Sequence, residues 1–295
     1  MRCTMTCMLA LFAFSAGVAS AQSPQTDPHA GHTLEKQAPA APVNERLPPD
    51  ASGAAEALKR SPRHQEWVDI KMAGAQAPIK TFIVYPERKE KAPVVIVIHE
   101  IFGLSDWIKG VADQLAEDGF IAVAPDLLSG MGPSGGGTEE LGEKATQVIR
   151  NLTPQDTIAK LNAVRDYAIK LPAANGKSAS VGFCWGGAVS FNYAAAQPGL
   201  NAAVVYYGTS PDAAAYANIK APVLGLYGGN DSRVNATIPT AEAEMDKLGK
   251  VYEKHIFEGA GHGFLRQQSG QNGANMKATQ QSWPLTIEFI QKHTK

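Results

Sequence analysis

The sequence predicts an α/β fold with a mostly parallel central sheet and helices on both faces. Short runs rich in β-branched residues alternate with longer runs of helical spacing along most of the chain. Residues 93–99 contain Val94-Val95-Ile96-Val97-Ile98, a continuous apolar run typical of a strand buried on both faces. Strands that alternate with helices need crossover connections, and these make the sheet parallel.

The elements can be placed in order from the same patterns. Residues 67–72 and 79–85 should form a hairpin at a sheet edge, joined by the turn at 73–78. Further strands are expected at 93–99, 120–124, 179–183, 202–207, 222–227 and 252–257, and helices at 105–117, 154–171, 185–197, 238–248 and 274–293. Residues 127–138 interrupt this alternation just after a strand, where open α/β sheets contact ligands.

The N-terminus has the features of a secretory signal peptide over residues 1–21. Arg2 provides the positive start, residues 8–18 form an apolar core, and Ala19-Ser20-Ala21 is a small-x-small cleavage site. The apolar run is too short for a membrane span. We therefore expect cleavage after Ala21 and a periplasmic or secreted product, with a retained N-terminal anchor as the alternative.

Residues 22–61 are rich in Ala, Pro and polar residues and show no sustained period. This composition predicts a flexible leader, which leaves residues 62–295 as the globular domain. His29 and His32 lie in the leader, but a specific metal site needs more ligands, so no metal site is expected. The chain has 27 basic and 28 acidic side chains and a net charge of −1, which argues against nucleic acid or an anionic membrane as the main partner.

The cysteine count favours a chemical role for Cys184. The chain has three cysteines, and Cys3 and Cys7 lie within the expected signal peptide. The mature protein would keep Cys184 alone, which cannot form an internal disulfide and is a liability in an oxidising compartment.

Cys184 also stands at the centre of a recognisable pattern, Gly182-Phe183-Cys184-Trp185-Gly186. This is the G-x-S-x-G nucleophile elbow with cysteine in place of serine, between an expected strand and an expected helix. Such a turn strains the backbone and needs glycine neighbours. It should expose the sulfur at the sheet edge, where the helix N-terminus favours a thiolate. The alternative is a buried structural cysteine in a glycine-rich joint.

An acid and a histidine follow in the order that the elbow predicts. Asp231 lies in the loop after the strand at 222–227, and His262 lies among glycines after the strand at 252–257. Asp231 could instead be a turn residue, Glu258 is an alternative acid, and His262 could be an ordinary loop histidine. Two N–H groups are expected to form an oxyanion hole, those of Trp185 and of Ile101 in the loop after residues 93–99.

Five segments together resemble the dienelactone hydrolase family of α/β-hydrolases, also called carboxymethylenebutenolidases. They are His-Glu-Ile-Phe-Gly at 99–103, Ala-Pro-Asp-Leu at 124–127, Gly-Phe-Cys-Trp-Gly-Gly at 182–187, Gly-Gly-Asn-Asp at 228–231 and Gly-His-Gly-Phe at 261–264. The resemblance covers the chain from about residue 64 to the C-terminus and implies the α/β-hydrolase fold.

The resemblance also implies roles for individual residues. Cys184 would be the nucleophile, His262 its base and Asp231 the group that orients the base. Glu100 would be a carboxylate that switches partner between Cys184 and its surroundings when substrate arrives, and a surface loop acid is the alternative for it. Arg266, with Phe102, would contact the substrate, and Arg266 would bind its carboxylate. The family has a second substrate-binding arginine, and this sequence has no clear match for it. Arg150 is only a loose candidate.

The sequence therefore predicts an exported hydrolase of a small ester or lactone, acting through an acyl-cysteine intermediate. We expect a small-molecule substrate, no metal or organic cofactor, no nucleic-acid or membrane partner, and a monomer. A cysteine-based thioesterase or peptidase, or a non-catalytic binding or redox-sensing homologue, remains as the alternative.

Overall fold

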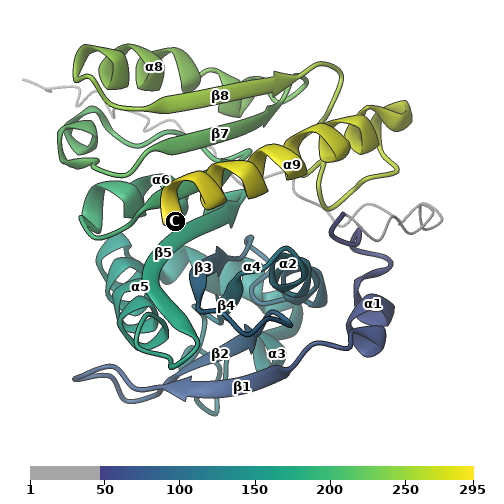
Figure 1. Cartoon of the computed structure of the whole chain (residues 1–295), viewed down its shortest axis with the longest axis vertical. Coiled ribbons are helices and arrows are strands. Elements are labelled where there is room, and N and C mark those ends of the chain that lie inside the picture. Colours follow the sequence, from purple (N-terminus) through teal and green to yellow (C-terminus); the bar gives the residue numbers. More distant parts are fainter. Residues whose placement is uncertain (1–46) are drawn as a thin grey trace, which may run out of the picture. The chain divides into compact units, whose positions relative to one another are not determined.

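An eight-stranded sheet organises residues 47–295, the part of the chain that the computed structural model describes (Figure 1). Its strands lie in the order β1-β2-β4-β3-β5-β6-β7-β8. Their bounds are β1 Gln65–Ile70, β2 Ile79–Val84, β3 Ala92–Ile98, β4 Ile121–Pro125, β5 Ala174–Phe183, β6 Ala202–Tyr206, β7 Val223–Gly228 and β8 Tyr252–Phe257.

The mostly parallel sheet and the edge hairpin are confirmed. β1 and β2 pair antiparallel at one edge, and β2 is antiparallel to β4. All other neighbouring strands are parallel, from β4 through β3 to β8. The carboxyl ends of β3, β5, β6, β7 and β8 therefore meet at one edge of the sheet.

Helices cover both faces of this sheet (Figure 1). Their bounds are α1 Ala54–Arg60, α2 Asp106–Glu117, α3 Thr138–Leu141, α4 Ala145–Val148, α5 Pro154–Ala168, α6 Trp185–Ala196, α7 Ser232–Asn235, α8 Ile238–Lys247 and α9 Ala274–Thr294, with 3₁₀ turns η1 Gly142–Lys144, η2 Ile149–Asn151, η3 Ala213–Asn218 and η4 Gln271–Gly273. One apolar core packs α1, α2 and α9 on one face, and a second packs α5, α6 and α8 on the other. The inner strands β3, β4, β6 and β7 are almost wholly buried, as the continuous apolar runs predict, whereas the edge strands β1 and β8 are partly exposed.

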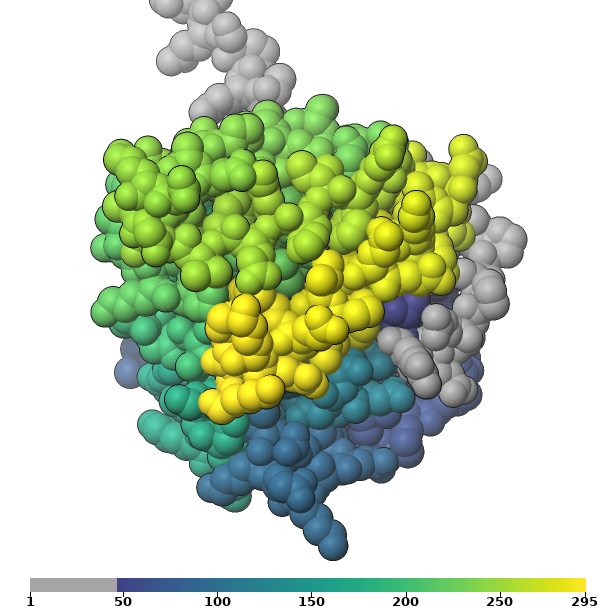
Figure 2. Space-filling model, turned by 45° about the horizontal axis from the view of Figure 1, so that its top comes forward, coloured from purple at the N-terminus to yellow at the C-terminus, as the bar shows by residue number. Residues whose placement is uncertain are grey.

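Helix α9 fastens the end of the chain to the first face. Figure 2 shows it as the yellow segment that crosses the surface between the green residues before it and the blue ones of the first half of the chain. Trp283 is buried and donates from its indole N–H to Asp118 at 2.9 Å. Thr286 and the hydroxyl of Tyr206 form a hydrogen bond of 2.7 Å beneath the helix.

The segment at 47–61 is ordered, so the expectation of a flexible leader up to residue 61 is wrong for this part. Leu47 is buried in the first core, and α1 packs on α2. The carbonyl of Pro49 accepts from the indole of Trp107 at 3.1 Å, and that of Pro48 accepts from the amide of Gln268 at 2.8 Å. These bonds satisfy the backbone of a proline-rich segment that composition alone makes look unstructured. The expected signal peptide and the rest of the leader lie outside the described residues.

The short elements α3, η1, α4 and η2 follow the irregular segment at 127–138, in a region for which no helix was expected. They pack Leu141, Ala145 and Ile149 against Leu128 and Ile101, which ties this region to the loop after β3. In the described part of the chain, no helix is both long and apolar enough to cross a membrane.

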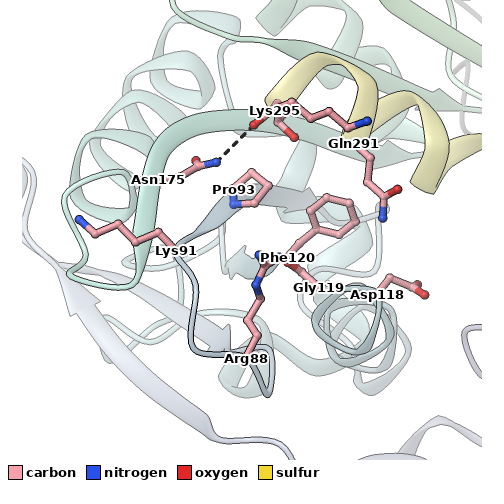
Figure 3. A pocket seen from close by; sticks show the side chains of 10 residues that line it. Arg88, Lys91, Pro93, Asp118, Gly119, Phe120, Asn175, Gln291 and Lys295 are labelled. Carbon is pink, nitrogen blue, oxygen red and sulfur yellow. Dashed lines mark hydrogen bonds between the residues drawn. The ribbon is translucent and has the colours of Figure 1, made fainter.

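A shallow cavity of about 240 Å³ lies at the opposite, amino edge of the sheet (Figure 3). Pro93 and Asn175 line it near the beginnings of β3 and β5, and Phe120 comes directly before β4. Asn175 donates to the carbonyl of Thr294 at 3.2 Å beside it. The residues expected to carry chemistry all follow the carboxyl ends of strands, so this cavity is not their site.

Candidate active site

Cys184 occupies the strained turn between β5 and α6. Its backbone has φ 55° and ψ −115°, a conformation that residues other than glycine rarely adopt. A Cβ at position 182 would collide with the carbonyl oxygen of Gly186, and one at 186 would collide with the carbonyls of Ile98 and His99. The two flanking glycines are therefore required for the turn to close, as the elbow pattern predicts.

The thiol itself is buried, which corrects the expectation of an exposed sulfur. Cys184 is 6% exposed. Burial raises its pKa to about 12, and the nearby Glu100 carboxylate adds to the rise. The N–H of Trp185, at the first residue of α6, opposes this shift but does not outweigh it. Burial and Glu100 therefore favour the neutral thiol over the thiolate that the helix N-terminus alone would favour.

Asp231 and His262 come together as the sequence predicts. The Nδ1 atom of His262 lies 2.5 Å from Oδ2 of Asp231. Asp231 is buried directly after β7, and its other oxygen accepts the N–H of Val234 at the start of the short α7. The alternative acid Glu258 is exposed, whereas the buried Asp231 holds the ring. A carboxylate at Nδ1 fixes the orientation of an imidazole and leaves Nε2 for proton transfer.

The two residues expected to supply oxyanion donors lie close together, because Trp185 packs against the apolar cluster that contains Ile101. Trp185 begins α6, where a helix leaves its first N–H groups without intrahelical acceptors. Ile101 is buried in the loop after β3, and no oxygen of the described residues accepts its N–H. Both amides can therefore donate to a developing negative charge.

Glu100 pairs with Arg266 and not with the cysteine. Oε2 of Glu100 lies 3.1 Å from Nε of Arg266, and their side chains are 4% and 15% exposed. Burial raises the pKa of Glu100, while Arg266 and then His262 counteract the rise. Phe102 lies beneath the guanidinium at 5.1 Å, a cation–π contact that holds Arg266 in place. Arg150 is exposed on η2.

Three residues of the site escaped the sequence analysis. Asp126 accepts from the N–H and hydroxyl of Thr138, at 2.7 and 2.8 Å, and the Thr138 hydroxyl accepts from the N–H of Leu104 at 2.9 Å. These bonds fix the loop that carries Ile101 to the segment at 127–138. The Ala-Pro-Asp-Leu segment was the available signal for Asp126.

Tyr207 lies directly after β6 and packs on the His262 ring, with the two ring centroids 5.1 Å apart. No motif in the sequence pointed to this residue.

This edge of the sheet thus carries a buried cysteine at a strained turn, a histidine oriented by an aspartate, two amide N–H groups and a buried acid–arginine pair. This set suits acyl transfer, in which a thiolate attacks a carbonyl and amides hold the oxyanion. A model of the dienelactone hydrolase family matches residues 79–294, most of the chain. The chain belongs to the dienelactone hydrolase family.

Individual relatives agree with the family match. The chain is 29% identical to a putative carboxymethylenebutenolidase of Saccharolobus solfataricus, over 74% of this chain and 96% of the relative. It is 32% identical to the carboxymethylenebutenolidase of Pseudomonas putida, over 61% and 78%. A putative dienelactone hydrolase structure from Klebsiella pneumoniae matches with a TM-score of 0.68 at 24% identity, covering 77% of this chain and 98% of that one.

These findings confirm the α/β-hydrolase fold. As a member of the dienelactone hydrolase family, the protein is a carboxylic-ester hydrolase that acts on small esters or lactones.

Proposed function

We propose that this dienelactone hydrolase family member cleaves its ester or lactone through a Cys184–His262–Asp231 triad and an acyl-cysteine intermediate. The observations that carry the proposal are the strained elbow at Cys184 and the 2.5 Å His262–Asp231 pair. These three residues follow β5, β7 and β8, parallel strands whose carboxyl ends lie at the same edge of the sheet.

The reaction begins when His262 takes the proton of Cys184. The thiolate then attacks the substrate carbonyl, and the amides of Ile101 and Trp185 hold the oxyanion. As the tetrahedral intermediate collapses, the bond from the carbonyl carbon to the alcohol oxygen breaks and His262 returns the proton to that oxygen. Water, deprotonated by His262, attacks the thioester, which releases the acid and restores the thiol.

Arg266 is proposed to bind a carboxylate on the substrate. A guanidinium can hold a carboxylate with two parallel hydrogen bonds, and Phe102 orients this one. In the resting protein Arg266 compensates Glu100, so a substrate carboxylate would compete with Glu100 for it. The preferred substrate is therefore an ester or lactone that carries a carboxylate.

The test is hydrolysis of p-nitrophenyl acetate and of a carboxylate-bearing butenolide by the wild type and by Cys184→Ala. The proposal predicts at least a thousandfold loss of turnover in the variant with an unchanged melting temperature. Full activity of Cys184→Ala would refute the cysteine mechanism, while inactivity of the wild type toward a panel of esters and lactones would refute the substrate class.

We also propose that the protein is exported, because residues 1–21 carry the features of a signal peptide. Expression in a bacterial host followed by fractionation tests this. The mature N-terminus should be Gln22 and the protein should be periplasmic or in the medium, and an unprocessed cytosolic chain would contradict the proposal.

A further inference from the structure

Tyr207 combines two unfavourable local features at one residue. It follows β6 with φ 39°, in the left-handed region, where a bulky side chain is strained. It is fully buried, and its hydroxyl has no hydrogen-bond partner among the described residues. A buried hydroxyl without a partner lowers the stability of the fold and calls for a functional explanation.

The neighbouring Tyr206 shows what an ordinary buried tyrosine does in this core. It is equally buried and is the last residue of β6. Its hydroxyl shares a 2.7 Å hydrogen bond with Thr286 of α9. Tyr206 therefore satisfies its hydroxyl within the fold, whereas Tyr207 keeps an unused donor.

The surroundings of Tyr207 are those of the active site. Its ring packs on that of His262 at 5.1 Å and edge-on against Phe264 at 5.3 Å. Its pKa is raised well above the usual value by burial and then by the Glu100 carboxylate, with Arg266 acting in the opposite direction. Glu100 and Arg266 therefore both lie within electrostatic reach of the phenol.

Burial limits what this hydroxyl can contact. Tyr207 has no exposed surface, so a group that arrives from solvent is a less suitable partner than a buried neighbour. A buried carboxylate that acts electrostatically on Tyr207 is that of Glu100, whose counterion in this structure is Arg266 at 3.1 Å. If a substrate carboxylate draws Arg266 away, Glu100 is left as an uncompensated buried charge, which is strongly unfavourable.

We propose that Tyr207 is a positioning residue whose hydroxyl donates a hydrogen bond to Glu100 when Arg266 turns to a substrate carboxylate. The inference rests on the proposed function of Arg266. The new bond replaces the compensation that Glu100 loses, and so makes Arg266 available to the substrate. Its benefit arises on binding and is specific to substrates with a carboxylate.

The test compares two esters with the same leaving group, p-nitrophenyl acetate and mono-p-nitrophenyl succinate, which adds a carboxylate. In Tyr207→Phe, kcat/KM for the succinate ester should fall about ten- to hundredfold, mainly through KM, as expected for a lost hydrogen bond to a charged group. The loss for the acetate ester should be at least fivefold smaller. The melting temperature should stay equal or rise, because the variant removes an unpaired buried hydroxyl.

Tyr206→Phe is the matched control, since it removes the same atom from the next residue. It should lower the melting temperature through loss of the Thr286 bond and leave the ratio of the two esters as in the wild type. In a Glu100→Gln background, Tyr207→Phe should no longer change this ratio, because the two groups act as a pair.

Equal losses for both esters, or the same change of ratio in Tyr206→Phe, would overturn the role of Tyr207. Persistence of the full Tyr207→Phe effect in the Glu100→Gln background would also overturn it. If the wild type hydrolyses both esters and the ratio stays constant in Tyr207→Phe, this role fails and the proposed function stands. If the wild type hydrolyses neither, both fail.

Discussion

The Glu100 carboxylate and the Arg266 guanidinium face each other at 3.1 Å in the buried part of the site. The acid raises the pKa of the neighbouring Cys184, and the arginine partly offsets that effect. A neutral thiol resists oxidation better than a thiolate, which suits a cysteine kept for catalysis. The pair thus couples the ionisation of the Cys184 thiol to any group that binds Arg266.

Replacement of Glu100 by Gln should make Cys184 more reactive toward iodoacetamide. The charge of Glu100 disfavours the thiolate, so its removal lowers the pKa of Cys184 from about 12. Burial is the larger cause of the raised pKa and remains, so the pKa should stay above that of a free cysteine. We expect the alkylation rate at pH 8 to rise about tenfold, which is one pKa unit.

The pH dependence of alkylation measures this directly, with the exposed Glu258→Gln as a control that leaves the profile unchanged. An unaltered or upward-shifted profile in Glu100→Gln would show that Glu100 does not act on the thiol.

Replacement of Asp231 by Asn should impair turnover and leave the fold intact. Asn can still accept the N–H of Val234 at the start of α7, so local structure is kept. Asn is neutral and no longer offers a carboxylate to the His262 ring. We therefore expect kcat to fall about 10²- to 10⁴-fold. Steady-state kinetics of Asp231→Asn beside Glu258→Gln checks this. A comparable loss in Glu258→Gln would mean that the acid has been assigned to the wrong residue.

Asp118 should make the stability of the protein depend on pH far from the active site. Burial raises its pKa to about 6, against about 3.9 in an unfolded chain. The folded state therefore binds the proton more tightly, and the resulting stabilisation is complete below about pH 4 and lost as the pH rises through 6.

Asp118→Asn tests this, because Asn stays neutral and still offers an oxygen to the indole of Trp283. Relative to the wild type, the variant should gain roughly 1–2 kcal/mol in free energy of unfolding at pH 8 and nothing at pH 4, after allowance for partial exposure. Urea denaturation at the two pH values measures the difference. An equal change at both would exclude the titration of Asp118 as the cause.

The sequence predicted the strands and the His262–Asp231 pair because both depend on local signals. The β-branched run at 93–99 admits one interpretation, and chain order places Cys184, Asp231 and His262 after parallel strands at one edge. Each of these elements agrees with the structure to within a few residues, the largest difference being the earlier start of β5 at Ala174.

The features that the sequence did not predict depend on contacts between distant segments. Cys184 is buried as part of the first apolar core, and the partner of Glu100 lies in a loop after β8. The strained backbone of Tyr207 and the ordered structure of residues 47–61 likewise depend on tertiary packing. Amino-acid composition does not reveal such contacts.

The central claim is the acyl-cysteine intermediate, and intact-protein mass spectrometry during turnover tests it most directly. Wild-type protein mixed with p-nitrophenyl acetate and quenched in acid within milliseconds should gain the mass of one acetyl group, mapped by peptide sequencing to Cys184. Cys184→Ala should gain none. Steady turnover by the wild type with no acyl group on Cys184 at any quench time, or equal turnover by Cys184→Ala, would contradict the account.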